Sequence, residues 1–211
     1  MSSPVSEAGV RGFLHEPAAP NGSGLVLTHG AGANCEAALL VALAKAFEER
    51  GWVVLRCDLP FRQIRLKGPP FPAQGAADRA GLNTAIDYIR PRAQRLFLGG
   101  HSYGGRQATM LAAETKKQRD AWGVEALILL SYPLHPPAKP EQMRTAHFPA
   151  LWTPALFFHG TKDGFGTPDE MENAIEMIPA RHELRLMKGE GHGLATKHAA
   201  TIAEAFIQFA G

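Results

Sequence analysis

The sequence predicts a doubly wound α/β fold, in which a mostly parallel sheet of about seven strands is flanked by helices. Two observations predict it: apolar runs typical of strands buried on both faces, and amphipathic helical segments that alternate with those runs. Alternation favours a parallel sheet, because each helix carries the chain back to start the next strand in the same direction. At 211 residues the chain has room for one well-buried domain, so we expect a single domain over 1–211.

Six short runs of mostly apolar residues are the predicted major strands. Only 23 residues precede the first of them, which leaves room for one edge strand near 10–14. We therefore expect a sheet that is shortened at its N-terminal edge. The six runs cover 24–28, 52–57, 95–99, 126–130, 155–158 and 183–187.

Between these runs, apolar residues recur at helical spacing. Gly51 follows the first of these segments as a predicted C-cap, and Pro168 opens a later one. A further helix is predicted to begin near Gly105. The residues that carry the helical spacing are Leu39, Leu43 and Phe47, then Leu82, Ile86 and Ile89, then Met171, Ile175 and Ile178, and finally Ile202, Phe206 and Phe209.

Residues 100–104 read Gly-His-Ser-Tyr-Gly and form the most informative motif of the chain. They follow a predicted strand and precede a predicted helix, which is the context of a nucleophile elbow, a sharp turn that lifts a serine hydroxyl clear of the sheet. Glycines flank the serine because a side chain at either neighbouring position would collide across the turn. Ser102 is therefore the candidate nucleophile.

An acid and a histidine follow Ser102 in the order that such a nucleophile requires, each just after a later predicted strand. We expect His192 to remove the serine proton and Asp163 to fix the imidazole tautomer and stabilise the imidazolium. Asp58 also follows a predicted strand and is the rival acid. It ranks below Asp163 because it precedes the elbow.

A loop of small residues, His29-Gly-Ala-Gly-Ala-Asn34, follows the first predicted major strand. Small side chains let backbone N–H groups approach a carbonyl oxygen that becomes negative during acyl transfer. We expect the oxyanion hole to consist of the amides of Ala31 and Tyr103, the latter because it follows the nucleophile.

Together with the segments that end at Asp163 and surround His192, these motifs resemble the α/β-hydrolases, in particular small lidless serine hydrolases related to dienelactone hydrolase. The resemblance covers nearly the whole chain. It implies a Ser-His-Asp mechanism on an ester, thioester or similar acyl bond, without metal or organic cofactor. Dienelactone hydrolases proper have cysteine at the elbow, so Ser102 favours ordinary serine esterases. The short segment 131–152 stands where many relatives insert a lid and predicts an open site.

Composition argues against several other functions. The net charge is +2 with scattered basic residues, so we expect no nucleic-acid partner. No apolar stretch approaches the roughly 20 residues that cross a bilayer, and the N-terminus lacks an export signal, so we expect a cytoplasmic protein with no membrane partner. In that compartment Cys35 and Cys57 are expected to be reduced.

Cofactor motifs are also lacking in the sequence. The nine histidines are dispersed without metal-ligand spacing, and Gly30 and Gly32 lack the third glycine of a dinucleotide fingerprint. The expected partner is a small acyl substrate.

The sequence leaves some alternatives open. Acyl transfer to an acceptor other than water uses the same chemistry, and a non-catalytic interaction module with this fold is the alternative of another class. Arg62 and Arg65, in the proline-rich connection 59–73, either attract an anionic substrate or are solvated, and 131–152 either borders the substrate or does not. Oligomeric state stays open.

Overall fold

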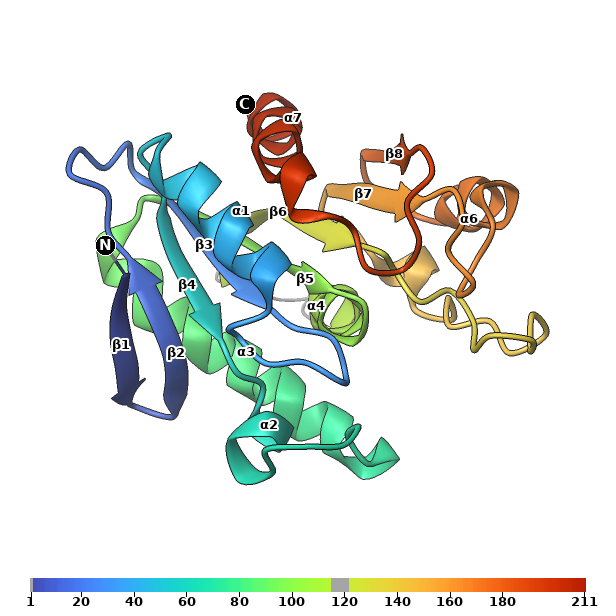
Figure 1. Ribbon diagram of the computed structural model, residues 1–211, viewed down its shortest axis with the longest axis horizontal. Coiled ribbons are helices and arrows are strands. Elements are labelled where there is room, and N and C mark those ends of the chain that lie inside the picture. Colours follow the sequence, from blue (N-terminus) through green and yellow to red (C-terminus); the bar gives the residue numbers. More distant parts are fainter. Residues whose placement is uncertain (1, 115–121) are drawn as a thin grey trace.

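A single eight-stranded sheet organises the protein in its computed structural model, which describes residues 2–114 and 122–211 (Figure 1). The strand order is β1-β2-β4-β3-β5-β6-β7-β8. The pairs β1–β2 and β2–β4 are antiparallel, and every other neighbouring pair is parallel. The predicted α/β class is thus confirmed. The strands are β1 Ser2–Glu7, β2 Val10–His15, β3 Ser23–Thr28, β4 Val53–Cys57, β5 Arg95–His101, β6 Val124–Leu130, β7 Ala155–Gly160 and β8 His182–Met187.

Helices cover both faces of this sheet. In the sequence they are α1 Ala38–Glu48, α2 Pro60–Ile64, α3 Gly75–Ile89, α4 Tyr103–Glu114, α6 Pro168–Ile175 and α7 Ala199–Ala210. Single 3₁₀ turns occupy η1 Pro72–Gln74, η2 Arg90–Arg92, η4 Phe148–Ala150 and η5 Thr196–His198. The expected caps are present: Gly51 has a φ of +82°, and Pro168 follows Thr167, whose hydroxyl accepts from the Glu170 amide.

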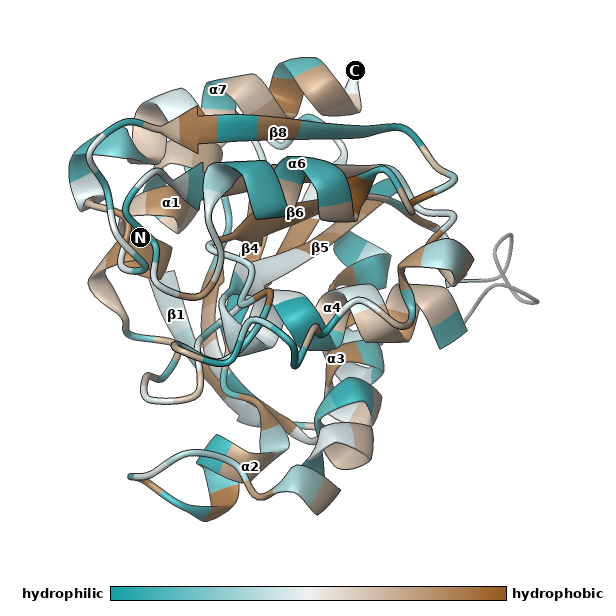
Figure 2. Ribbon diagram, turned by 90° about the vertical axis from the view of Figure 1, so that its right-hand side faces the viewer, coloured by the Kyte–Doolittle hydropathy of each residue, from teal (hydrophilic) through white to brown (hydrophobic). Residues whose placement is uncertain are grey.

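Two apolar cores lie on opposite faces of the sheet. Leu25 and Leu27 of β3 pack with α1 and α7, whereas Val26 between them packs with α3 and α4 on the other face. The central strands are therefore buried on both sides, and Figure 2 shows them as apolar ribbons between the helical layers. This double burial is why their sequences are continuous apolar runs rather than alternating ones.

The prediction that the sheet is shortened at its N-terminal edge is wrong. Residues 2–7 form an eighth strand, joined to β2 by a two-residue turn in which Ala8 and Gly9 have φ values of +50° and +77°. Among the six residues of β1 only Val5 is buried, so no apolar run marks this strand in the sequence. Pro4 is tolerated because the outer side of an edge strand needs no backbone donor.

The carboxyl ends of the parallel strands meet at one edge of the sheet. The loops that follow β3, β5, β7 and β8 therefore come together there, as expected for an open parallel sheet. Along the described part of the chain, no helix is both long and apolar enough to cross a bilayer.

Candidate active site

The turn after β5 holds Ser102 in the left-handed region, with a φ of +52°. Its amide donates to the Leu130 carbonyl at the end of β6 over 2.8 Å, and its carbonyl accepts from the Arg106 amide over 3.0 Å as α4 begins. This conformation costs a non-glycine residue about 1–2 kcal/mol, which the bonds to both neighbouring elements offset. The elbow is thereby fixed between the sheet and the helix.

Glycines are required at the elbow because the end of β3 packs directly against it. A Cβ atom at Gly100 would lie 2.7 Å from the Thr28 carbonyl oxygen, and one at Gly104 would lie 2.6 Å from the His29 carbonyl oxygen. Both contacts are with backbone and are shorter than real Cβ contacts. The predicted reason for the flanking glycines is thus visible in the packing.

The structure brings Ser102, His192 and Asp163 together from three separate loops. The Nε2 atom of His192 lies 2.7 Å from the Ser102 hydroxyl oxygen, and its Nδ1 atom lies 2.8 Å and 3.0 Å from the two carboxylate oxygens of Asp163. A carboxylate only accepts hydrogen bonds, so the imidazole proton belongs on Nδ1. Nε2 is then free to accept the serine proton.

Asp163 is held as a buried anion. The residue is 5% exposed, and its Oδ1 also accepts from the Phe165 amide over 2.9 Å. Burial alone would raise the pKa of this carboxyl, but the hydrogen bonds from His192 and from the Phe165 amide bring it below its ordinary value. The carboxylate is therefore ionised at neutral pH.

Two residues that the sequence analysis did not assign hold the His192 loop. The Phe165 ring stacks on the His192 imidazole with a centroid distance of 4.1 Å and an interplanar angle of 29°. His101 places its Nε2 2.8 Å from the His192 carbonyl oxygen. Burial lowers the pKa of His101, so this ring is neutral and donates from Nε2. His101 lies next to the nucleophile in sequence, but nothing in the sequence signals that it reaches this carbonyl.

The two expected oxyanion residues, Ala31 and Tyr103, line the same cavity as Ser102. Tyr103 is the first residue of α4, and the first amides of a helix have no acceptor within it. The Tyr103 hydroxyl donates to Asp78 of α3 over 2.7 Å, which ties this end of α4 to the neighbouring helix.

The Arg62 side chain holds the loop 29–34, which contains the expected oxyanion residue Ala31. It is 2% exposed and donates to the carbonyl oxygens of Ala31 and Ala33, each over 2.8 Å. Its remaining hydrogen bonds go to the carbonyl oxygens of Arg65 and Gly68. The structure therefore does not show Arg62 facing an anionic substrate. Its buried guanidinium donates to backbone carbonyls of the loop 29–34 and of the connection 59–73.

Arg65 lies at the surface of the same connection. Its guanidinium carbon is 4.4 Å from the centroid of the Phe71 ring, and it also donates to the Pro69 carbonyl oxygen. Neither arginine of this connection lines the cavity that holds Ser102.

Asp58, the rival acid, does not contact His192 or Ser102 and is bound elsewhere. Its carboxylate forms an ion pair with Arg11 at 2.8 Å and accepts from the Cys35 amide over 2.7 Å. The nearest imidazole nitrogen, His29 Nε2, is 3.6 Å away. This side chain therefore joins the loop after β4 to β2 and to the loop after β3.

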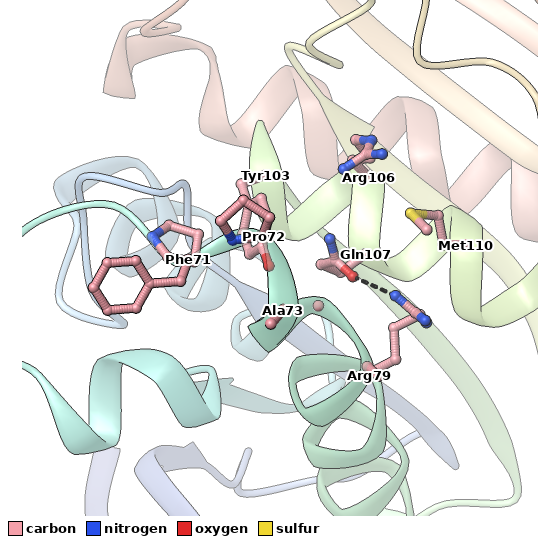
Figure 3. A pocket seen from close by; sticks show the side chains of 11 residues that line it. Phe71, Pro72, Ala73, Arg79, Tyr103, Arg106, Gln107 and Met110 are labelled. Atoms are coloured by element: carbon pink, nitrogen blue, oxygen red, sulfur yellow. Dashed lines mark hydrogen bonds between the residues drawn. The ribbon is translucent and has the colours of Figure 1, made fainter.

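A cavity of about 600 Å³ opens above Ser102. The turn at Ser102, the loop 29–34 and His192 line this cavity. Prolines of the connection 59–73 and of the segment 131–152, including Pro70 and Pro133, also line it. The segment 131–152 therefore does border the site, through Pro133 and Arg144. A second cavity of about 410 Å³ adjoins the first and continues between α3 and α4 (Figure 3).

Solved structures of other proteins match this fold over nearly the whole chain. The dienelactone hydrolase of Anabaena variabilis is 21% identical with a TM-score of 0.74, covering 99% of this chain and 96% of that one. The Est1E protein of Butyrivibrio proteoclasticus, in a structure with ferulic acid bound, is 16% identical with a TM-score of 0.75 and covers 98% of both chains. XC6422 of Xanthomonas campestris, described as a serine hydrolase without lid, is 17% identical with a TM-score of 0.67, covering 99% and 93%.

At these identities the three likenesses show a shared fold, and they confirm the resemblance to dienelactone hydrolase and to lidless serine hydrolases. In addition, residues 21–207 match the family model described as an alpha/beta hydrolase domain. This match spans most of the sequence, and the chain therefore belongs to the alpha/beta hydrolase domain family.

Proposed function

We propose that the protein is a cytoplasmic serine hydrolase that cleaves a small ester, thioester or related acyl substrate without a cofactor. One observation carries the proposal: a hydroxyl, an imidazole and a buried carboxylate form a continuous hydrogen-bonded chain, with 2.7 Å between Ser102 Oγ and His192 Nε2. This is the arrangement that activates a serine hydroxyl for attack on a carbonyl.

In the proposed reaction Ser102 Oγ attacks the substrate carbonyl while His192 Nε2 takes the serine proton. The amides of Ala31 and Tyr103 stabilise the oxyanion, and a single donor of this kind is typically worth about 10²–10³ in rate. The leaving group departs with the proton from His192, which leaves an acyl-serine. Water, activated by the same imidazole, then releases the acid and restores the free hydroxyl.

The surroundings of the triad support this assignment. Asp163 is ionised and buried, so it stabilises the imidazolium that forms during attack. Phe165 covers one face of the imidazole and limits its rotation. A cavity of about 600 Å³ has the size of sites that bind small organic ligands.

Ser131 offers a matched control for testing the nucleophile. It too follows a central strand, with a φ of +49° and an amide that donates to the end of the next strand, Phe158, over 2.8 Å. Its hydroxyl is fully buried and does not line the cavity above Ser102. The two serines therefore share a backbone environment and differ in access to the histidine.

The test is labelling with a fluorophosphonate and turnover of a panel of 4-nitrophenyl esters. We expect a stoichiometric adduct on Ser102, located by peptide mass spectrometry. Ser102→Ala should lose the adduct and lower kcat by about 10⁶-fold, as for other serine triads, whereas Ser131→Ala should retain both. A folded wild-type protein that forms no adduct and turns over no ester would overturn the proposal and favour a non-catalytic interaction module.

A further inference from the structure

Two arginines of the catalytic cavity lack a carboxylate partner. Arg106 lies on α4 and Arg144 in the segment 131–152, and both line the cavity that holds Ser102. Within 2–114 and 122–211, no Asp or Glu is in ion-pair distance of either guanidinium, whereas the neighbouring Arg79 pairs with Glu114 at 2.8 Å. In Figure 3 Arg79 is also joined to Gln107, while Arg106 stands apart from that pair.

Their hydrogen-bonding capacity is largely unused. Among the described residues, the Nε atom of Arg106 is buried without an acceptor, although the same side chain reaches the Tyr132 hydroxyl. The Arg144 guanidinium donates there only to the Pro133 carbonyl oxygen, at the long distance of 3.5 Å. A guanidinium has five N–H donors, and leaving a buried one unpaired is costly. An anion in the cavity that both side chains line would instead supply acceptors for their terminal N–H groups.

The two positive charges also act on each other. Burial lowers the pKa of Arg144, and the charge of Arg106 lowers it further, so the two guanidinium groups are close enough to repel. Two further groups face them. Tyr132 is neutral, because burial raises its pKa, and it donates to the Arg144 carbonyl oxygen over 2.7 Å. His147 is neutral as well, since burial and the charges of Arg106 and Arg79 lower its pKa to about 4.

The position of this pair relative to the nucleophile limits the length of a ligand. The Arg106 amide donates to the Ser102 carbonyl, so Arg106 lies four residues and about 6 Å along the helix axis beyond Ser102. Because both residues also line one cavity of about 600 Å³, we infer that a substrate whose carbonyl carbon lies at Ser102 reaches Arg106 through a short chain. Tyr103 and several prolines line the same cavity, which suits a few methylene groups.

We propose that Arg106 and Arg144 form an anion subsite, and that the substrate carries a second, unreactive carboxylate a few carbons from the scissile acyl bond. A half-ester of a short dicarboxylic acid has this chemistry. Arginine binds carboxylates through paired N–H donors, and two arginines are able to hold one carboxylate from two sides. The inference rests on the proposed function, since it names the substrate class of the same site.

The test compares two substrates that differ only in charge: mono-4-nitrophenyl glutarate and its neutral methyl diester, each corrected for spontaneous hydrolysis. We expect the wild-type kcat/KM to favour the charged substrate. Arg106→Met and Arg144→Met should each lower the ratio of charged to neutral kcat/KM by about 10- to 100-fold, the loss of a charge-assisted hydrogen bond. Arg79→Met, which changes an arginine already paired with Glu114, should keep the ratio.

Two further measurements keep the test decisive if a methionine variant does not fold. Arg144→Lys should retain part of the preference, because it keeps the charge and loses the paired donors. In the wild type, added salt should raise KM for the charged substrate more than for the diester. A phosphonate of the same length distinguishes the anion: a higher kcat/KM than for the carboxylate would assign the subsite to phosphate esters instead and overturn the carboxylate assignment.

Equal kcat/KM values for the charged and neutral substrates would overturn the anion subsite, even with Ser102 labelled and active. A ratio unchanged in both methionine variants would do the same. Failure of the proposed function has a different signature, since no ester of either charge would then be turned over.

Discussion

Asp58 and Asp163 occupy similar places in the fold and have different partners. Each directly follows a parallel strand or the turn after it, each is buried, with exposures of 7% and 5%, and each lies near a histidine. Asp163 contacts His192 at 2.8 Å, whereas His29 Nε2 is 3.6 Å from Asp58 and its other ring nitrogen is bonded to the Gly30 carbonyl.

The difference lies in what neutralises each carboxylate. Arg11 forms an ion pair with Asp58. The negative charge of Asp58 therefore joins β2 to the loop after β4. Asp163 has no arginine or lysine in ion-pair distance among the described residues and faces only His159 and His192. A carboxylate balanced by a permanent cation stabilises the fold, while one left with an imidazole is available to stabilise a proton that arrives during a reaction.

The largest expected effect is on turnover in Asp163→Asn. The asparagine amide donates where the carboxylate accepted, so it favours the His192 tautomer with its proton on Nε2, which is unable to take the serine proton. We expect kcat to fall by about 10³- to 10⁴-fold in 4-nitrophenyl ester assays. Asp58→Asn is the matched variant and should lose less than 10-fold. Equal losses would erase the distinction between the two carboxylates.

For the free energy of unfolding we expect the reverse order, with the larger loss in Asp58→Asn than in Asp163→Asn. Asp58→Asn weakens the hydrogen bonds that this buried carboxylate accepts from Arg11 Nε and the Cys35 amide, so we expect a loss of about 1–2 kcal/mol in the free energy of unfolding. Urea unfolding at pH 7 measures it. A smaller loss than in Asp163→Asn would show that Asp58 is not the structural member of the pair.

Acid unfolding sharpens the comparison further. The pKa of Asp163 is lower in the folded protein than its ordinary value, which is about 3.9 in unfolded chains. The ionised carboxylate therefore adds stability above about pH 4, and this contribution disappears as the pH falls through the folded pKa. Urea midpoints measured from pH 6 down to pH 2 should fall less steeply in Asp163→Asn than in the wild type. Parallel curves would contradict the lowered pKa.

The smallest effect is expected for Arg11→Lys. The Arg11 side chain is 34% exposed, so solvent screens its ion pair with Asp58, and the lysine keeps the charge. It loses the donors that reach the carbonyl oxygens of Arg62 and Gln63. We expect a decrease of about 0.5–1 kcal/mol in urea unfolding and unchanged turnover. A loss above 2 kcal/mol would show that this ion pair behaves as a buried one.

The order of the site residues was predictable because two general rules act together. The glycines around Ser102 mark a turn that only small neighbours permit, and the carboxyl ends of parallel strands meet at one edge, which brings Asp163 and His192 to that turn. Arg62 was not predictable in the same way. Its partners are backbone carbonyls of Ala31 and Ala33, and a backbone acceptor leaves no residue type in the sequence to signal it.

Other features were missed because they depend on exposure or on distant packing. β1 is an exposed edge strand, and no apolar run marks it in the sequence. Phe165 lies close to Asp163 in sequence, yet its stacking on His192 follows from the path of two loops in space. Arg106 and Arg144 likewise come to one cavity from a helix and a loop, which no local pattern reveals.

The turn between β1 and β2 has a practical consequence for engineering. Ala8 occupies a left-handed conformation that glycine or asparagine adopts with less strain, and such residues are favoured in two-residue hairpins with positive φ at both positions. Exchanging this alanine for asparagine would therefore raise thermal tolerance by a fraction of the roughly 1–2 kcal/mol involved. Because β1 forms the outermost strand and β5 lies four places away, we expect this gain without a change at the proposed active site.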